Sequence, residues 1–126
     1  MLTDIEVASR REDIQMLEDQ IKVLEDKKNE IRQELIRDNM DKAKARFPQL
    51  TPGDKVKVVC KTWDDTLEEF TGFFKGFNIP QYCGDETDFR YVRMVFGNPK
   101  KDGTMSLKGE TYQYVFRIVS LEKVTE

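Results

Sequence analysis

The chain has 126 residues, of which 36% are charged, with a net charge of −3 and no histidine. This length allows one small domain plus an appendage, and the charge balance lacks the strongly basic footprint of a nucleic-acid-binding domain. No apolar run approaches the ~18 residues of a membrane span, and the acidic N-terminus is unlike a signal peptide. We therefore expect a cytoplasmic protein in which the two cysteines, Cys60 and Cys83, are reduced.

Glycine and proline divide the chain into two parts. The first 47 residues contain neither, whereas all seven glycines and all four prolines lie from Pro48 onward. Because these two residue types disfavour helix interiors and mark turns, the division predicts an α+β fold. We expect a long helix over residues 1–47, a junction over residues 48–54 and a β domain over residues 55–126.

Both ends of the expected helix carry local signals. The sequence Thr-Asp-Ile-Glu at residues 3–6 is a capping box, in which the side chains of Thr3 and Glu6 satisfy each other's backbone amides. At the other end Phe47 precedes Pro48, and a residue before proline is pushed out of the helical conformation. The helix should therefore begin near Thr3 and end near Phe47.

Apolar residues recur along this helix at alternating steps of three and four, the spacing of a coiled-coil seam. The seam comprises Ile14, Leu17, Ile21, Leu24, Lys28, Ile31 and Leu35. The lysine costs stability but can fix register and oligomer state. A helix of about 44 residues reaches ~66 Å, roughly twice the ~30 Å diameter of a globule of ~75 residues. We therefore expect a partner helix, from a second copy or from another protein.

The charges beside the seam argue mildly against a parallel homodimer. That arrangement would set Asp13 against Glu18 and Lys27 against Arg32, which are both like-charge pairs. An antiparallel pair can place Glu18 beside Arg32, although some offsets bring Asp13 near Glu34. Antiparallel self-pairing and a different partner therefore both stay open.

Beyond Leu35 the apolar stripe moves to a new face, formed by Ile36, Met40, Ala43 and Phe47. Such a shift indicates either a stutter in the coiled coil or a contact between the helix and the β domain. We favour the contact, because Phe47 lies at the junction.

The β domain is expected to hold five short antiparallel strands. Alternating apolar and lysine residues predict the first strand over residues 55–61. Further strands are expected over about 69–79, 89–96, around 105–107 and 112–124, with a hairpin turn over 98–103.

The second of these strands should carry aromatic residues on both faces. We expect Phe74 on the face of Phe70 and Phe77 on the opposite face, with Gly72 and Gly76 marking bulges or strong bending.

The entry Leu-Thr-Pro-Gly-Asp-Lys-Val-Lys-Val, residues 50–58, resembles the first strand of SH3-like barrels, including KOW-type modules. The resemblance covers about a dozen residues and implies a five-stranded SH3-like β-barrel. A five-stranded OB barrel is the alternative. No binding residues are carried over by this resemblance.

No constellation of catalytic or metal-binding residues stands out. The absence of histidine removes the commonest general base and the commonest zinc ligand. The acidic clusters at residues 64–69 and 85–88 match no calcium-loop spacing, and no glycine-rich phosphate loop is present. We therefore expect a protein that is not an enzyme and holds no cofactor or metal.

Aromatic residues are dense in the β domain, and a core this small cannot bury all of them. We expect a groove for a protein partner near Trp63, Tyr82 and Tyr91, with Arg90 and Arg93 beside it. The function expected is that of an oligomeric interaction protein, such as an adaptor, an assembly component or a small inhibitor. A nucleic-acid module and a small-ligand sensor with its pocket at an oligomer interface are the alternatives.

Overall fold

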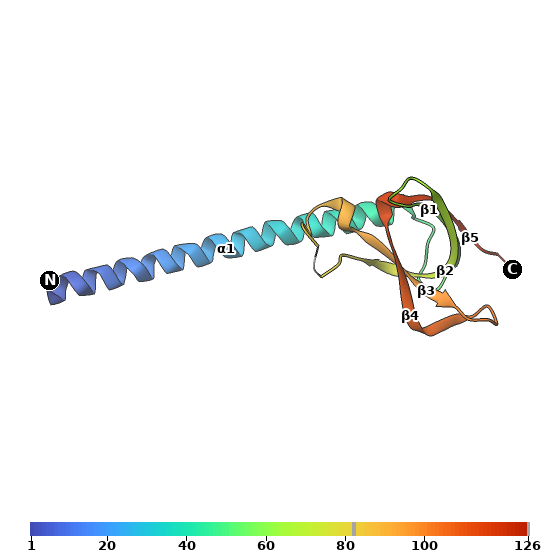
Figure 1. Ribbon diagram of the computed structural model, residues 1–126. Helices are drawn as coiled ribbons and strands as arrows, with labels where there is room; N and C mark the ends of the chain where they lie inside the picture. The colour runs from blue at the N-terminus through green and yellow to red at the C-terminus, as the bar shows by residue number, and fades with distance from the viewer. Residues whose placement is uncertain (82, 126) are drawn as a thin grey trace. The chain divides into compact units, whose positions relative to one another are not determined.

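The computed structural model describes residues 1–81 and 83–125. One long helix, α1 (Asp4–Arg46), is followed by a five-stranded antiparallel sheet, so the α+β fold class is confirmed (Figure 1). The chain forms two compact units, Met1–Leu35 and Ile36–Glu126. The first unit is helical, and the second contains the last three turns of α1 together with the sheet.

The predicted limits of α1 are confirmed. The Thr3 hydroxyl accepts a hydrogen bond from the Glu6 amide at 3.2 Å, and the Glu6 carboxylate accepts one from the Thr3 amide at 3.2 Å. This capping box satisfies two backbone amides that have no partner within the helix. At the far end α1 stops at Arg46, two residues before Pro48.

The end of α1 belongs to the core of the second unit. Ala43 is fully buried with Val92 and Val115, and Met40 and Phe47 pack against this cluster. The contact predicted between the shifted apolar stripe and the β domain is therefore confirmed.

The neighbouring Asn39 adds a polar contact to this packing. Its side chain is buried, and its Nδ2 donates a 2.7 Å hydrogen bond to the Thr87 carbonyl. This bond satisfies a buried polar group, which would otherwise destabilise the core.

The sheet has the strand order β4-β3-β2-β1-β5. Its strands are β1 (Lys55–Lys61), β2 (Leu67–Asn78), β3 (Arg93–Pro99), β4 (Met105–Tyr114) and β5 (Ile118–Lys123). The pairings leave β4 and β5 as the two edges (Figure 1). The sheet is therefore open, and the closed barrel stays a prediction.

Two 3-10 turns replace parts of the predicted strands. Residues 89–91 were expected to begin the third strand but form η1 (Phe89–Tyr91), which Asp88 caps by accepting a 3.0 Å hydrogen bond from the Arg90 amide. The prediction of a single strand over residues 112–124 is also wrong. Its first residues end β4, and η2 (Val115–Arg117) separates them from β5.

The hairpin turn predicted between the third and fourth strands is confirmed. The Lys100 amide donates to the Thr104 carbonyl at 2.7 Å, and the Gly103 amide donates to the Lys100 carbonyl at 3.0 Å. Gly103 has a φ of +86°, a conformation that glycine adopts without steric cost.

The main core of the sheet unit is formed by Val56, Val58, Phe74, Met94 and Phe96. Phe77 packs against this core, with its ring centroid 5.4 Å from that of Phe74. The prediction that Phe77 lies on the opposite face from Phe74 is therefore wrong.

The bulge predicted at Gly76 explains the position of Phe77. The register between β2 and β3 shifts between Phe74 and Gly76, so the extra residue reverses the alternation of side chains beyond it. Gly72, in contrast, pairs regularly with Val56 and marks no bulge.

Candidate functional site

The predicted helix seam lies on the surface of the helical unit. Its six apolar residues are 46–65% exposed, and Lys28 is exposed as well. Five further apolar residues of the same unit are exposed outside the seam: Met1, Leu2, Ile5, Met16 and Val23. The helical unit therefore presents a long apolar surface that the chain itself leaves accessible.

A tightly bonded turn carries Trp63 between β1 and β2. The Thr62 amide donates to the Thr66 carbonyl at 2.8 Å, and Asp65 takes a left-handed conformation with a φ of 64°. The Asp64 carboxylate accepts hydrogen bonds from the hydroxyls of Thr62 and Thr66. These bonds lower the pKa of Asp64 below its usual value, and the bond from Thr62 has the largest effect.

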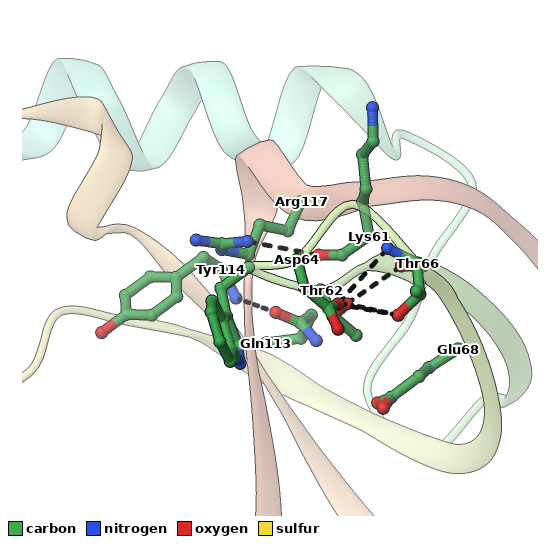
Figure 2. Close-up of a pocket in the computed structure, with 9 residues that line it drawn as sticks. Lys61, Thr62, Asp64, Thr66, Glu68, Gln113, Tyr114 and Arg117 are labelled. Atoms are coloured by element: carbon green, nitrogen blue, oxygen red, sulfur yellow. Dashed lines mark hydrogen bonds between the residues drawn. The ribbon is translucent and has the colours of Figure 1, made fainter.

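Trp63 is 86% exposed at this turn, beside a hollow of about 430 Å³. The hollow is lined by Lys61, Thr62, Trp63, Asp64, Thr66, Glu68, Gln113, Tyr114 and Arg117. Figure 2 shows the bonded Thr62, Asp64 and Thr66 on one side and Tyr114 on the other. The Arg117 guanidinium donates to the Lys61 carbonyl at 3.4 Å, which ties η2 to the end of β1.

A second hollow of about 270 Å³ shares Tyr114 and Arg117 with the first. Its other lining residues are Arg90, Tyr91 and Phe116. The two hollows are therefore neighbours, and we call their aromatic and arginine lining residues the aromatic surface: Trp63, Arg90, Tyr91, Tyr114, Phe116 and Arg117.

The aromatic surface is ordered by contacts among its own side chains. The Phe116 ring lies 6.0 Å from the Tyr114 ring between centroids, and the Arg117 guanidinium lies 5.1 Å from the Phe116 centroid. Phe116 nevertheless remains 45% exposed. A partly exposed aromatic cluster next to a cation can receive an apolar or aromatic side chain of a partner.

Three of the five residues predicted for the partner site lie on the aromatic surface: Trp63, Arg90 and Tyr91. The Arg90 side chain is also bound to the Asp88 carboxylate, with Nη2 2.8 Å and Nε 3.1 Å from Oδ2. This pair lowers the pKa of Asp88 and raises the pKa of Arg90.

Of the other two predicted residues, Arg93 does not line the aromatic surface. Arg93 donates from Nε to the Asn78 side-chain oxygen at 2.7 Å, and its guanidinium lies 4.0 Å from the Tyr112 ring centroid. Tyr82 lies outside the described residues.

Sequence reasoning missed Tyr114, Phe116 and Arg117. Their direction depends on the fully buried Val115, whose amide donates to the Val92 carbonyl at 3.0 Å. The alternation of aromatic and aliphatic residues in Tyr-Val-Phe-Arg is the signal that was available, but it was assigned to a continuous strand.

Cysteine and acidic side chains are the remaining candidates for catalysis or metal binding. Cys60 is buried in the core, and its sulfur accepts a 3.0 Å hydrogen bond from the Gln113 side-chain amide. Within residues 1–81 and 83–125, no cluster of three or more histidine, cysteine, aspartate or glutamate side chains is arranged to hold a metal ion. Among the described residues, no helix is long and apolar enough to cross a membrane.

Comparison of this chain with known protein families, curated proteins and solved structures found no match.

Proposed function

We propose that this protein is a non-enzymatic interaction module that associates with itself through the helix seam and binds a partner protein through the aromatic surface. Joining two copies raises the overall affinity of a weak binding site, because the second contact becomes intramolecular. Adaptors, components of larger assemblies and small protein inhibitors use this organisation.

The exposure of Trp63 is the observation that carries the proposal. An 86% exposed indole contributes little to the core, yet it lies on a turn held by several hydrogen bonds. Tryptophan is among the residues most enriched in binding hot spots, and a turn whose backbone is already held loses less entropy on binding.

The chemistry around Trp63 favours a peptide segment over a nucleic acid. The first hollow is lined by Asp64 and Glu68 as well as by Lys61 and Arg117, so its charge is mixed. The two carboxylates would repel phosphates, which dominate nucleic-acid binding. An extended peptide with apolar side chains suits an aromatic-lined groove of this kind.

The proposal includes the SH3-like barrel as the scaffold of the aromatic surface. The strand order returns β5 to the side of β1, and the bulge at Gly76 bends β2. Both features suit a small barrel, in which bulges help a sheet to curve. The turn that carries Trp63 and the turn η2 would then meet at one end of this barrel.

Affinity capture from the native host tests the partner site. The full chain is compared with Trp63→Ala and with Leu107→Ala, a control that removes another strongly exposed apolar side chain outside the aromatic surface. We expect Trp63→Ala to lose the captured partner and Leu107→Ala to retain it, with both melting temperatures unchanged. Retention of the same partner by Trp63→Ala would contradict the proposed site.

Light scattering tests self-association independently. We expect the full chain at micromolar concentration to give a multiple of the 14.8 kDa chain mass. A mass of one chain would contradict the role proposed for the helix seam.

A further inference from the structure

We propose that the helical unit pairs antiparallel with a second copy of this chain, in the register that sets Leu17 of one copy against Ile21 of the other. This proposal rests on the self-association proposed above and adds its orientation and register. The exposed seam, the charges beside it and the length of the helical unit support it.

The register aligns apolar side chains along the paired helices. Three kinds of apolar layer each form twice, as a twofold axis requires: Leu17 with Ile21, Ile14 with Leu24, and Val7 with Ile31. The same register sets Thr3 beside Leu35 of the other copy. The paired segment therefore spans the helical unit, which ends at Leu35.

The flanking charges complement each other in this arrangement. Asp13 of one copy lies beside Lys27 of the other, and Arg11 lies beside Glu25, each pair forming twice. A parallel pair would instead oppose Asp13 to Glu18. Opposite charges at flanking positions set partner choice and orientation in coiled coils.

The register also carries electrostatic costs. Arg10 faces Lys28 of the other copy, Glu6 lies near Glu34, and Glu18 meets its own counterpart. The Arg10 guanidinium lies 3.8 Å from the Glu6 carboxylate of its own helix, which balances part of its charge. Long basic side chains can also carry their charge to water while their stems pack. A parallel pair would also stack Arg10 and Lys28 on their own copies. Its flanks would oppose Asp13 to Glu18 and Lys27 to Arg32, and only Glu6 with Arg11 would be complementary.

Other antiparallel registers are less favourable. A shift by one heptad that lengthens the overlap sets Asp13 beside Glu34 and Glu18 beside Glu25, which are both like-charge pairs. The opposite shift leaves the apolar Ile31 and Leu35 without a facing helix. A shift by two heptads that lengthens the overlap brings Asp38 into the seam, where it would lose hydration. The proposed register avoids these arrangements.

Charge reversal distinguishes the two orientations. In the antiparallel pair, Asp13→Lys or Lys27→Glu alone should weaken the dimer about tenfold, and the double variant should recover most of the affinity. In a parallel pair each single reversal should strengthen the dimer, because it would remove a like-charge pair. Sedimentation equilibrium of the full chain measures the dimer affinity of each variant. Asp26 lies on the helix face away from the seam, so Asp26→Lys is the matched control and should leave the dimer affinity nearly unchanged.

A distance measurement tests the register. Spin labels are attached to Gln33→Cys in a Cys83→Ser background, where the remaining Cys60 is buried. Residue 33 of one copy should lie beside residue 5 of the other, so the two labels should be about 42 Å apart along the helix axes. Residue 33 lies on the outer face of the helix, so a parallel pair would bring the labels level and separate them only by the width of the pair, about 20 Å. Labels on Asp19→Cys, at the level of the twofold axis and on the same outer face, should be separated only by the width of the pair in either orientation and verify the readout.

The outcomes separate this proposal from the one on which it rests. A monomeric chain would contradict self-association and the pairing together. A dimer that is strengthened by Asp13→Lys, or whose labels at position 33 are no farther apart than those at position 19, would contradict the antiparallel pairing alone.

Discussion

At Gly72 the side chain of Phe96 occupies the space where a Cβ atom would lie. A Cβ at this position would be 3.0 Å from the Phe96 Cβ and 3.3 Å from the Gly97 carbonyl oxygen. Because Phe96 is fully buried, the crowding can be relieved only by shifting β2 or β3. We expect Gly72→Ala to lower the free energy of unfolding by about 1–3 kcal/mol, measured by chemical denaturation.

Gly84→Ala is the matched control for this substitution. Its Cβ would meet the Tyr91 hydroxyl at 2.8 Å, which is the outer end of a side chain that can rotate away. The loss of stability should therefore be clearly smaller than for Gly72→Ala. Equal losses would show that the close packing at Gly72 is not the cause.

Asp54 should make the stability of the sheet unit depend on pH. Its carboxylate accepts a 2.8 Å hydrogen bond from the Thr51 amide and lies 3.2 Å from the Lys123 ammonium, and these contacts lower its pKa. Because the pKa is lower in the folded state, the charged carboxylate stabilises the fold at pH values above its unfolded pKa of about 3.9. This contribution to stability is lost as the pH falls through the folded pKa.

Thermal melts between pH 7 and pH 3 measure this contribution. Asp54→Asn should lower the melting temperature at pH 7, and the difference from the unsubstituted chain should shrink below about pH 4. A difference that stays constant over this range would exclude the carboxylate charge as its origin.

At the scale of the helix, Leu24 and Val23 provide a direct comparison. They are adjacent and similarly exposed, at 65% and 61%, but only Leu24 lies in the seam. Leu24→Asp places a charge in a layer that would become dry on pairing, so it should reduce the mass in light scattering to that of one chain. Val23→Asp should leave the assembly intact. The same response to both changes would contradict the heptad assignment.

Elements with strong local signals were predictable from the sequence. The capping box at Thr3 and the proline at position 48 set the limits of α1, and alternating valines set β1. The hairpin before Thr104 likewise depends on nearby turn residues. These signals act within a few residues, so tertiary contacts do not override them.

The misassigned segments depend on contacts between distant residues. Residues 115–117 have strand-like composition, but the bond from the Val115 amide to Val92 stops the strand and starts a turn. The bulge at Gly76 likewise changes the face of Phe77. For the candidate site, Trp63 was predicted from the density of aromatic residues in so small a domain. Phe116 and Arg117 were not predicted, because their direction follows from the burial of Val115.

At the scale of the whole molecule, the sheet should not fold without the end of α1. A chain that begins at Ile36 retains Ala43, Phe47 and the bond from Asn39 to Thr87, and it should unfold cooperatively. A chain that begins at Leu50 lacks these groups and leaves Val92 and Val115 uncovered. We expect this shorter fragment to lack a cooperative thermal transition in circular dichroism. A dispersed amide NMR spectrum from it would contradict this expectation.

Trp63 is the only tryptophan of the chain, and its exposure has a spectroscopic consequence. Its indole meets water in the folded state much as it would in the denatured state, so the wavelength of its emission should change little on unfolding. A partner that covers the aromatic surface would remove this water and shift the emission to the blue. The chain therefore carries an intrinsic fluorophore that should report partner binding while remaining nearly silent to folding.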